Sequence, residues 1–255
     1  MQTQFSETIE YYLEMDNDFL NLNQLLDRKL KIEFENYQCS NCAKQKKIFR
    51  QGFCYDCFYE QPSAGDWIMK PELSTAHLGI EDRDIAYEKA VQLKPHIVYL
   101  ALSSEIKVGV TRKSQVPTRW IDQGATKALS ILEVPNRYLA GISEVALKNY
   151  VSDKTSWQKM LKNEVSSGDL KLKKEELVKH LPLEVHPYIL DNSEETLNLN
   201  YPVNQYPTKI KSLNIIKNKY YEGILKGVKG QYLIFDDGTV FNVRNNEGLV
   251  VSINL

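Results

Sequence analysis

All four cysteines of this 255-residue chain fall within one short segment. They follow the spacing C-x2-C-x11-C-x2-C, at Cys39, Cys42, Cys54 and Cys57. Two CxxC pairs on facing knuckles can place four thiolates tetrahedrally around Zn²⁺, at about 2.3 Å from the metal. Because four sulfur ligands complete the coordination shell, the spacing favours a structural zinc ion over a catalytic one. It predicts a zinc ribbon over residues 38–60.

Two disulfides or a redox-active CxxC are the alternatives to zinc. Disulfides require an oxidising compartment, and the acidic start of the sequence lacks the basic and apolar regions of a secretory signal. A redox motif would be a single CxxC in a thioredoxin-like setting. The longest apolar run, IVYLAL at 97–102, is strand-sized and too short for a membrane span. We therefore expect a soluble cytoplasmic protein with one zinc ion and no membrane association.

The formal net charge of -1 excludes a polycationic chain, so a surface that binds nucleic acid must be a local patch. The loop between the two CxxC pairs is a candidate, since cations suit phosphates and aromatic rings suit stacked bases. Its basic and aromatic residues are Lys44, Lys46, Lys47, Arg50, Phe49 and Phe53. The alternative is a solvated loop whose phenylalanines cover the zinc site, and the loop sequence does not decide between the two.

Hydrophobic periodicity and turn signals predict an α+β protein. The core predicted after the connector is a small sheet flanked by helices, and the chain is predicted to end in a small β-barrel or meander. The predicted segments are a β lead-in (1–37), the ribbon (38–60), a connector with a short helix (61–94), the core (95–165), a helical linker (166–204) and a small β unit (205–255).

Residues 96–112 are predicted to form a β-hairpin whose second limb alternates strictly. One face of that limb is apolar, and the other carries Lys107, Gly109 and Thr111. Gly109 is predicted to leave room for a ligand to approach the backbone. The hairpin face is thus a candidate binding surface.

Residues 136–151 are predicted to form the clearest helix of the chain. Its apolar positions cover most of its surface, except for a line of Arg137, Gly141, Glu144 and Lys148 at helical spacing. The pattern therefore predicts a helix that is buried except along this line, with Glu144 at its middle.

Chemically distinctive side chains of the predicted core would suit phosphodiester hydrolysis if they converged. A lone carboxylate can hold Mg²⁺, arginines can neutralise phosphoryl oxygens, and a phenol or amine of lowered pKa can accept a proton. The candidates are Tyr99, Lys107, Arg112, Arg119 and Glu144, with Lys113 as a further contact to nucleic acid.

The segments VYLAL, EIKVGVTR, PTRW and AGISEVAL together resemble the GIY-YIG nuclease superfamily, over about residues 96–165. The resemblance implies that Tyr99 is the tyrosine of the first motif, that Val108 and Gly109 end the second motif, and that Arg119 is the helix arginine. It also implies that Glu144 binds the metal. With the ribbon, KPEL (70–73) and KGQYLIFDDGTVFNVR (229–244), the whole chain resembles a prokaryotic domain-of-unknown-function family that combines a zinc ribbon with a GIY-YIG-like core.

One departure from the resemblance leaves catalysis open. Lys107 stands where the second motif has its tyrosine, so the general base would be Tyr99 or Lys107 itself. Each residue also has a structural explanation: Tyr99 as an interior aromatic, Glu144 as a partner of Lys148, and Lys107 as an edge-strand charge.

Two functions that involve nucleic acid therefore follow from the sequence, and a protein–protein adaptor with a structural zinc ion is a third interpretation. The first is a nucleic-acid-acting protein with a Mg²⁺-dependent endonuclease site. The alternative is a non-catalytic zinc-ribbon module that binds RNA or the ribosome. In both, the expected partner is DNA or RNA, contacted by Lys44, Lys46, Lys47, Arg50 and Lys113.

Overall fold

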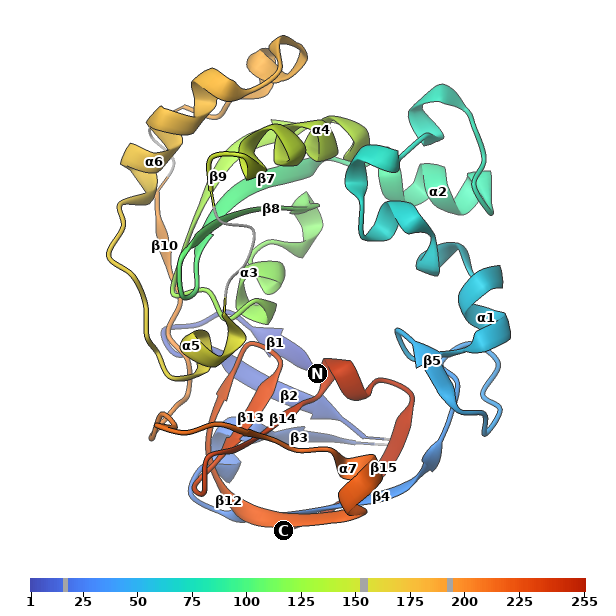
Figure 1. The fold of residues 1–255 in the computed structure, drawn as a ribbon, viewed down its shortest axis with the longest axis vertical. Helices are drawn as coiled ribbons and strands as arrows, with labels where there is room; N and C mark the ends of the chain where they lie inside the picture. Colours follow the sequence, from blue (N-terminus) through green and yellow to red (C-terminus); the bar gives the residue numbers. More distant parts are fainter. Residues whose placement is uncertain (16–17, 152–155, 192–194) are drawn as a thin grey trace. The chain divides into compact units, whose positions relative to one another are not determined.

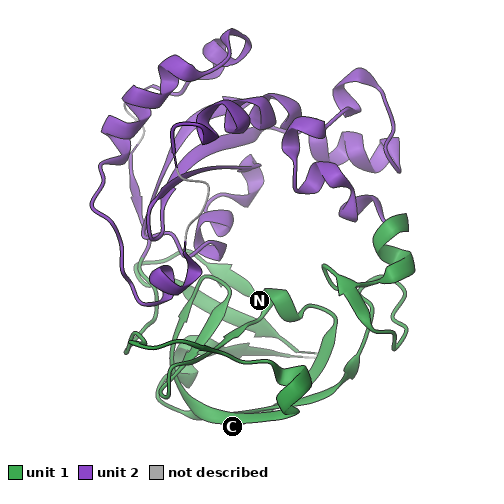
Figure 2. Ribbon diagram, viewed as in Figure 1, with its two compact units in different colours: residues 1–60, 200–255 green, residues 61–199 purple. Residues whose placement is uncertain are grey.

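The computed structural model describes residues 1–15, 18–151, 156–191 and 195–255. The chain divides into two compact units, residues 1–60 with 200–255, and residues 61–199 (Figure 2). The units contain several small sheets together with helices, which confirms the mixed α+β class. The predicted core (95–165) and linker (166–204) include residues 152–155 and 192–194, which lie outside the described residues.

The discontinuous unit begins with an antiparallel sheet of three short strands in the order β1-β2-β3 (Figure 1). The strands are β1 (Gln2–Gln4), β2 (Glu10–Glu14) and β3 (Phe19–Asn21). Asn23 joins this sheet to the turn that follows, because its side chain accepts a hydrogen bond from Tyr11 N–H and donates one to the Ile9 carbonyl.

A six-stranded sheet is also part of that unit, in the order β11-β14-β13-β12-β4-β15. The strands are β4 (Lys29–Tyr37), β11 (Lys211–Ser212), β12 (Tyr220–Lys229), β13 (Tyr232–Phe235), β14 (Thr239–Asn242) and β15 (Leu249–Asn254), with helix α7 (Ile215–Asn218) before β12. The N-terminal β4 lies between β12 and β15 and pairs antiparallel with both. Strands from both ends of the sequence therefore build one sheet.

The cysteine segment forms a short hairpin and a helix. Strands β5 (Ile48–Arg50) and β6 (Phe53–Cys54) pair antiparallel, and α1 (Tyr55–Glu60) follows directly. The turn between the strands uses a positive φ of 76° at Gly52, a conformation that favours glycine.

The continuous unit is built on a four-stranded antiparallel sheet in the order β10-β9-β7-β8. The strands are β7 (His96–Leu102), β8 (Ile106–Arg112), β9 (Lys127–Val134) and β10 (Leu197–Asn198). The hairpin predicted at 96–112 is confirmed, and its register pairs Tyr99 with Gly109. Every residue of β7 is buried.

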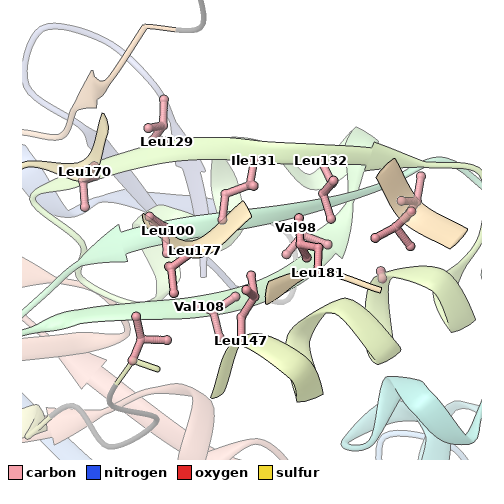
Figure 3. Close-up of a cluster of buried hydrophobic side chains, with 14 of the residues drawn as sticks. Val98, Leu100, Val108, Leu129, Ile131, Leu132, Leu147, Leu170, Leu177 and Leu181 are labelled. Carbon is pink, nitrogen blue, oxygen red and sulfur yellow. The ribbon is translucent and has the colours of Figure 1, made fainter. Parts of the chain in front are cut away.

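Five helices accompany this sheet in the described residues. They are α2 (Ile85–Gln92), α3 (Thr118–Asp122), α4 (Arg137–Lys148), α5 (Trp157–Leu161) and α6 (Leu170–Leu177). Helix α4 begins as predicted, because the Asn136 side chain accepts a hydrogen bond from Leu139 N–H and caps it. Apolar side chains of α4 and α6, including Leu147 and Leu177, pack with Val98, Leu100 and Val108 in one core (Figure 3).

The described part of the chain contains no helix long and apolar enough to cross a lipid bilayer.

The turn Pro71–Leu73, within the KPEL segment, packs against α4.

Candidate functional site

The four cysteines converge at the hairpin and α1. Their sulfur atoms all lie within 4.8 Å of one another, and Cys42 Sγ is 4.0 Å from Cys54 Sγ. Four ligands at about 2.3 Å in a tetrahedral shell stand roughly 3.8 Å apart, so the spacing fits a zinc ion. None of the cysteines forms a disulfide. The donor set and the distances therefore support a metal-binding cluster of the kind that the sequence predicts.

Hydrogen bonds orient the cysteine sulfurs, as is usual around a metal site. Cys54 N–H donates to Cys39 Sγ at 3.3 Å, and Asn41 Nδ2 donates to Cys57 Sγ at 3.4 Å. Burial opposes ionisation of Cys39, but backbone N–H donors outweigh it and lower the pKa of Cys39 to about 6. For Cys57, the Asn41 hydrogen bond is outweighed by burial and the neighbouring thiols, which raise its pKa to about 12.

The two phenylalanines of the inter-knuckle loop have different surroundings. Phe53 and Ile48 pack against the cysteines, whereas Phe49 is exposed. Side chains alternate along a strand, which explains why Ile48 and Phe49 point in different directions. The proposal that the phenylalanines cover the zinc site thus holds for Phe53 and not for Phe49.

The predicted phosphate contacts are all exposed, and two of them are engaged in ion pairs. Lys46 Nζ lies 2.7 Å from Asp56 Oδ2, and Lys113 Nζ lies 2.8 Å from Glu133 Oε1. Among the described residues, no ion pair involves the other three: Lys44, Lys47 and Arg50.

The Tyr99 ring occupies the space beside Gly109, where the sequence predicts room for a ligand. A Cβ atom built on Gly109 would lie 2.7 Å from the Tyr99 hydroxyl oxygen and 2.8 Å from its Cζ. The prediction of a gap for a ligand at Gly109 is therefore wrong: the glycine makes room for the tyrosine ring. Trp120 of α3 lies on the same side, with ring centroids 5.8 Å apart.

The Tyr99 side chain is 0% exposed, and its hydroxyl makes no hydrogen bond of normal geometry with a described residue. Burial raises the pKa of Tyr99 to about 12, while Arg119 and Gln123 act in the opposite direction and Glu144 adds to the rise. The ring thus lies near Arg119, Gln123 and Glu144, with its hydroxyl protonated at neutral pH.

Lys107 pairs with Ala101, two pairs along the hairpin from the Tyr99–Gly109 pair, and is partly buried. Burial and, to a smaller extent, the nearby Arg119 lower the pKa of Lys107 to about 8, with Glu144 acting in the opposite direction. Among the described residues, Lys107 has no ion pair at contact distance. A substantial fraction of the amine is therefore neutral slightly above neutral pH.

Glu144 lies on α4, which packs against β8 and β7. Its side chain is only 12% exposed, and its carboxylate is 3.4 Å from Lys148 Nζ, as an i,i+4 pair. Burial raises the pKa of Glu144; the ion pair with Lys148 opposes the rise and Glu72 adds to it. The carboxylate is thus partly desolvated and set among charges.

The line of α4 that the sequence predicts to be exposed is in fact partly covered. Gly141 is buried beneath the turn Pro71–Leu73, and a Cβ there would clash with the backbone of Pro71 and Glu72. The prediction failed because Gly141, which interrupts the apolar pattern, is needed there: only a residue without a Cβ allows this close backbone packing.

This packing brings in Glu72 and Arg137, which the sequence argument did not assign to the site. Glu72 Oε2 is buried without a hydrogen-bond partner among the described residues. Arg137 Nε and Nη2 donate to the Trp67 and Ile68 carbonyls at 3.1 and 2.8 Å. Burial lowers the pKa of Arg137 to about 10, and Glu144 counteracts it. In the sequence, Glu72 lies in the KPEL segment and Arg137 in the polar line of α4. Neither pattern indicated that these two segments contact each other.

Arg112 marks the end of β8, opposite His96 on β7, and its Nε donates to Gln115 Oε1 at 3.3 Å. Arg112 and Arg119 both act on the charge state of Arg137, so each of them lies within electrostatic range of Arg137. Glu144 thus interacts electrostatically with the cations Lys107 and Arg137, and these two form a charged group with Arg112 and Arg119. Such a group can bind a phosphate and leave one carboxylate to hold a cation.

Comparison with known proteins gives one match. A family described as "Protein of unknown function (DUF2797)" matches residues 27–251, which include both the cysteine cluster and the charged group. Neither the curated proteins nor the solved structures compared with the chain include a match to it.

Proposed function

Because the chain belongs to the family described as Protein of unknown function (DUF2797), its activity has to be argued from its own residues, and we propose a nucleic-acid-acting protein with a GIY-YIG-like phosphodiester site. Its reaction is Mg²⁺-dependent cleavage of a DNA or RNA strand. The zinc-binding cluster is a structural element, since four thiols leave no ligand position for chemistry.

One observation carries this proposal: Lys107, Arg119 and Glu144 come from three separate elements and interact electrostatically beside Tyr99. Charged residues that serve only solubility are normally exposed, because desolvation of a charge costs stability. A half-buried cluster of charges therefore indicates another role. Perturbed ionisable groups that cluster in this way are typical of functional sites.

Glu144 would hold a hard divalent cation such as Mg²⁺, and the unpartnered Oε2 of Glu72 offers a second oxygen of the type that Mg²⁺ prefers. When bound, the cation would polarise the scissile phosphate. Arg119 and Arg112 would neutralise charge on the phosphoryl oxygens, which is the role that guanidinium groups fulfil best.

The charge states favour Lys107 over Tyr99 as proton acceptor. With a pKa of about 8, Lys107 can accept a proton from water near physiological pH, whereas the pKa of Tyr99 is raised to about 12 by burial. Tyr99, with no exposed surface, would then position Arg119 and close the floor of the site at Gly109. This assignment makes the lysine the replacement for the missing second tyrosine.

The test is cleavage of a panel of labelled single- and double-stranded DNA and RNA substrates in the presence of Mg²⁺. We expect the wild type to cleave at least one class and Glu144→Ala to lose at least about 100-fold in rate. Glu175→Ala is the matched control, because Glu175 is exposed on α6 of the same unit. It should cleave like the wild type.

A wild type that leaves every substrate intact, with or without Mg²⁺, would refute the nuclease proposal. If such a protein still bound RNA, with affinity that falls steeply with salt, the alternative of a non-catalytic RNA- or ribosome-binding module would replace it. Losses on neutralising Lys44, Lys47 and Arg50 would then locate the binding surface.

A further inference from the structure

Three aromatic side chains lie exposed together beside the cysteine cluster. Phe49, Tyr55 and Tyr59 are 40%, 61% and 54% exposed, and we call them the aromatic patch. Their ring centroids lie 5.2 Å apart for Phe49 and Tyr55, 4.9 Å for Tyr55 and Tyr59, and 6.0 Å for Phe49 and Tyr59. A contiguous exposed aromatic surface of this kind calls for an explanation, since single exposed apolar residues are normal but clusters mark interaction sites.

The patch is held in place by the same segment that binds the metal. Tyr55 and Tyr59 are four residues apart on α1, so they share one face of that helix. Cys54 directly precedes Tyr55, and Cys57 lies between the two tyrosines. Phe58 supports the patch, with its ring 5.3 Å from that of Phe49. The rings therefore project from a rigid base, which lowers the entropy lost on binding.

The cations around the patch indicate what it binds. Residues 43–60 contain four basic and two acidic side chains, in a chain whose net charge is -1. Arg50 lies over the Phe49 ring, with its Cζ 5.4 Å from the centroid. Asp56 is occupied by Lys46, which leaves Lys44, Lys47 and Arg50 without an ion pair among the described residues. A patch for another protein's apolar surface would not be expected to be surrounded by unpaired cations.

We infer that the aromatic patch is a stacking surface for unpaired bases of a single-stranded nucleic acid, whose phosphates are bound by Lys44, Lys47 and Arg50. Bases in a duplex are already stacked on each other, so exposed rings select strands with accessible base faces. The inference rests on the proposed function in that it supplies the substrate class: a single strand or a single-stranded region.

Binding of labelled oligonucleotides by the full-length, zinc-loaded protein tests the inference. The probes are one sequence as single-stranded RNA, as single-stranded DNA and as the matched DNA duplex, titrated in the Glu144→Ala background so that no probe is cut. We expect at least one single strand to bind at least about 10-fold more tightly than the duplex. The double substitution Tyr55→Ala and Tyr59→Ala should weaken that binding by about 10- to 100-fold.

Two controls separate stacking from a folding defect. Tyr55→Phe with Tyr59→Phe keeps both rings and should bind within about 2-fold of the parent. Phe19→Ala removes an exposed ring of β3, outside the patch, and should also leave binding unchanged. Elemental analysis should find about one zinc per chain in each variant.

Single-strand binding that is unchanged by the alanine pair, or that falls equally with the phenylalanine pair, would overturn the inference, as would equal affinity for the duplex. These outcomes are independent of the cleavage assay. A protein that cleaves but binds without Tyr55 and Tyr59 keeps the proposed function and loses the stacking surface. A protein whose binding depends on Tyr55 and Tyr59 but that never cleaves keeps the stacking surface and loses the proposed nuclease activity.

Discussion

At the scale of single residues, the amine of Lys107 links the structure to the proposed chemistry. Burial, with a smaller contribution from Arg119, lowers the pKa of Lys107 to about 8 in the folded chain, from an ordinary value of 10.5. The folded state therefore binds fewer protons than the unfolded chain between those pH values. As a result, the charged lysine destabilises the fold fully below about pH 8, and the penalty disappears as pH rises past the unfolded pKa.

Cleavage should therefore increase with pH through about 8 and level off above it, because the neutral amine is the base. Lys107→Met should remove cleavage by at least about 100-fold. The same variant should stabilise the fold near pH 7, by roughly 1 kcal/mol after allowance for solvent screening. Rates across pH and urea unfolding at two pH values measure both effects. A rate that is flat from pH 6 to 9 would exclude Lys107 as the base.

At the scale of elements, the contact between α4 and the turn Pro71–Leu73 brings Glu72 near Glu144. Gly141 is the point of closest approach, since a Cβ would overlap the backbone of Pro71 and Glu72. Helix propensity and packing make opposite demands here. Alanine is preferred over glycine inside a helix by about 1 kcal/mol, but it does not fit the contact.

Gly141→Ala should consequently destabilise the protein, by roughly 1–3 kcal/mol in urea unfolding, in spite of its better helix propensity. Val145→Ala, at an exposed position of the same helix, is the matched control and should change stability by no more than about 0.5 kcal/mol. A stabilised Gly141→Ala variant would show that the turn does not press on the helix.

At the scale of the whole molecule, the chain folds into one continuous and one discontinuous unit. The sheet of the continuous unit uses only strands β7 to β10, all within residues 61–199. The sheet of the other unit has β4 inserted between β12 and β15, so residues 205–255, which the sequence treats as a small β unit, share their sheet with the predicted N-terminal lead-in.

Separate expression tests this division. Residues 61–199 should unfold cooperatively as an isolated fragment, whereas residues 200–255 should not, because without β4 the strands β12 and β15 lose the neighbour that joins them. Addition of residues 1–60 to the 200–255 fragment should restore cooperative unfolding. Circular dichroism measures the unfolding in each case. Independent cooperative folding of 200–255 would contradict the sheet order.

Local patterns predicted the local structure well. The period-two alternation of residues 106–112 predicted strand β8, and the apolar pattern of residues 136–151 predicted helix α4. The cysteine spacing predicted the cluster. Each of these signals depends on neighbours in sequence, where strand alternation, helical periodicity and knuckle geometry operate. The motif order also drew attention to Tyr99, Lys107, Arg119 and Glu144, which the structure brings within electrostatic range of one another.

The rest depended on contacts between residues far apart in the chain. The sequence by itself determined the thiols, the hairpin, the helix of residues 136–151 and the identity of the charged side chains. Only the tertiary structure decided that β4 joins β12 and β15, that the Tyr99 ring fills the space at Gly109, and that Glu72 lies near Glu144. The physical reason is that strand pairing and close packing depend on contacts between residues far apart in the chain. Periodicity and spacing reflect only the interactions of residues a few positions apart.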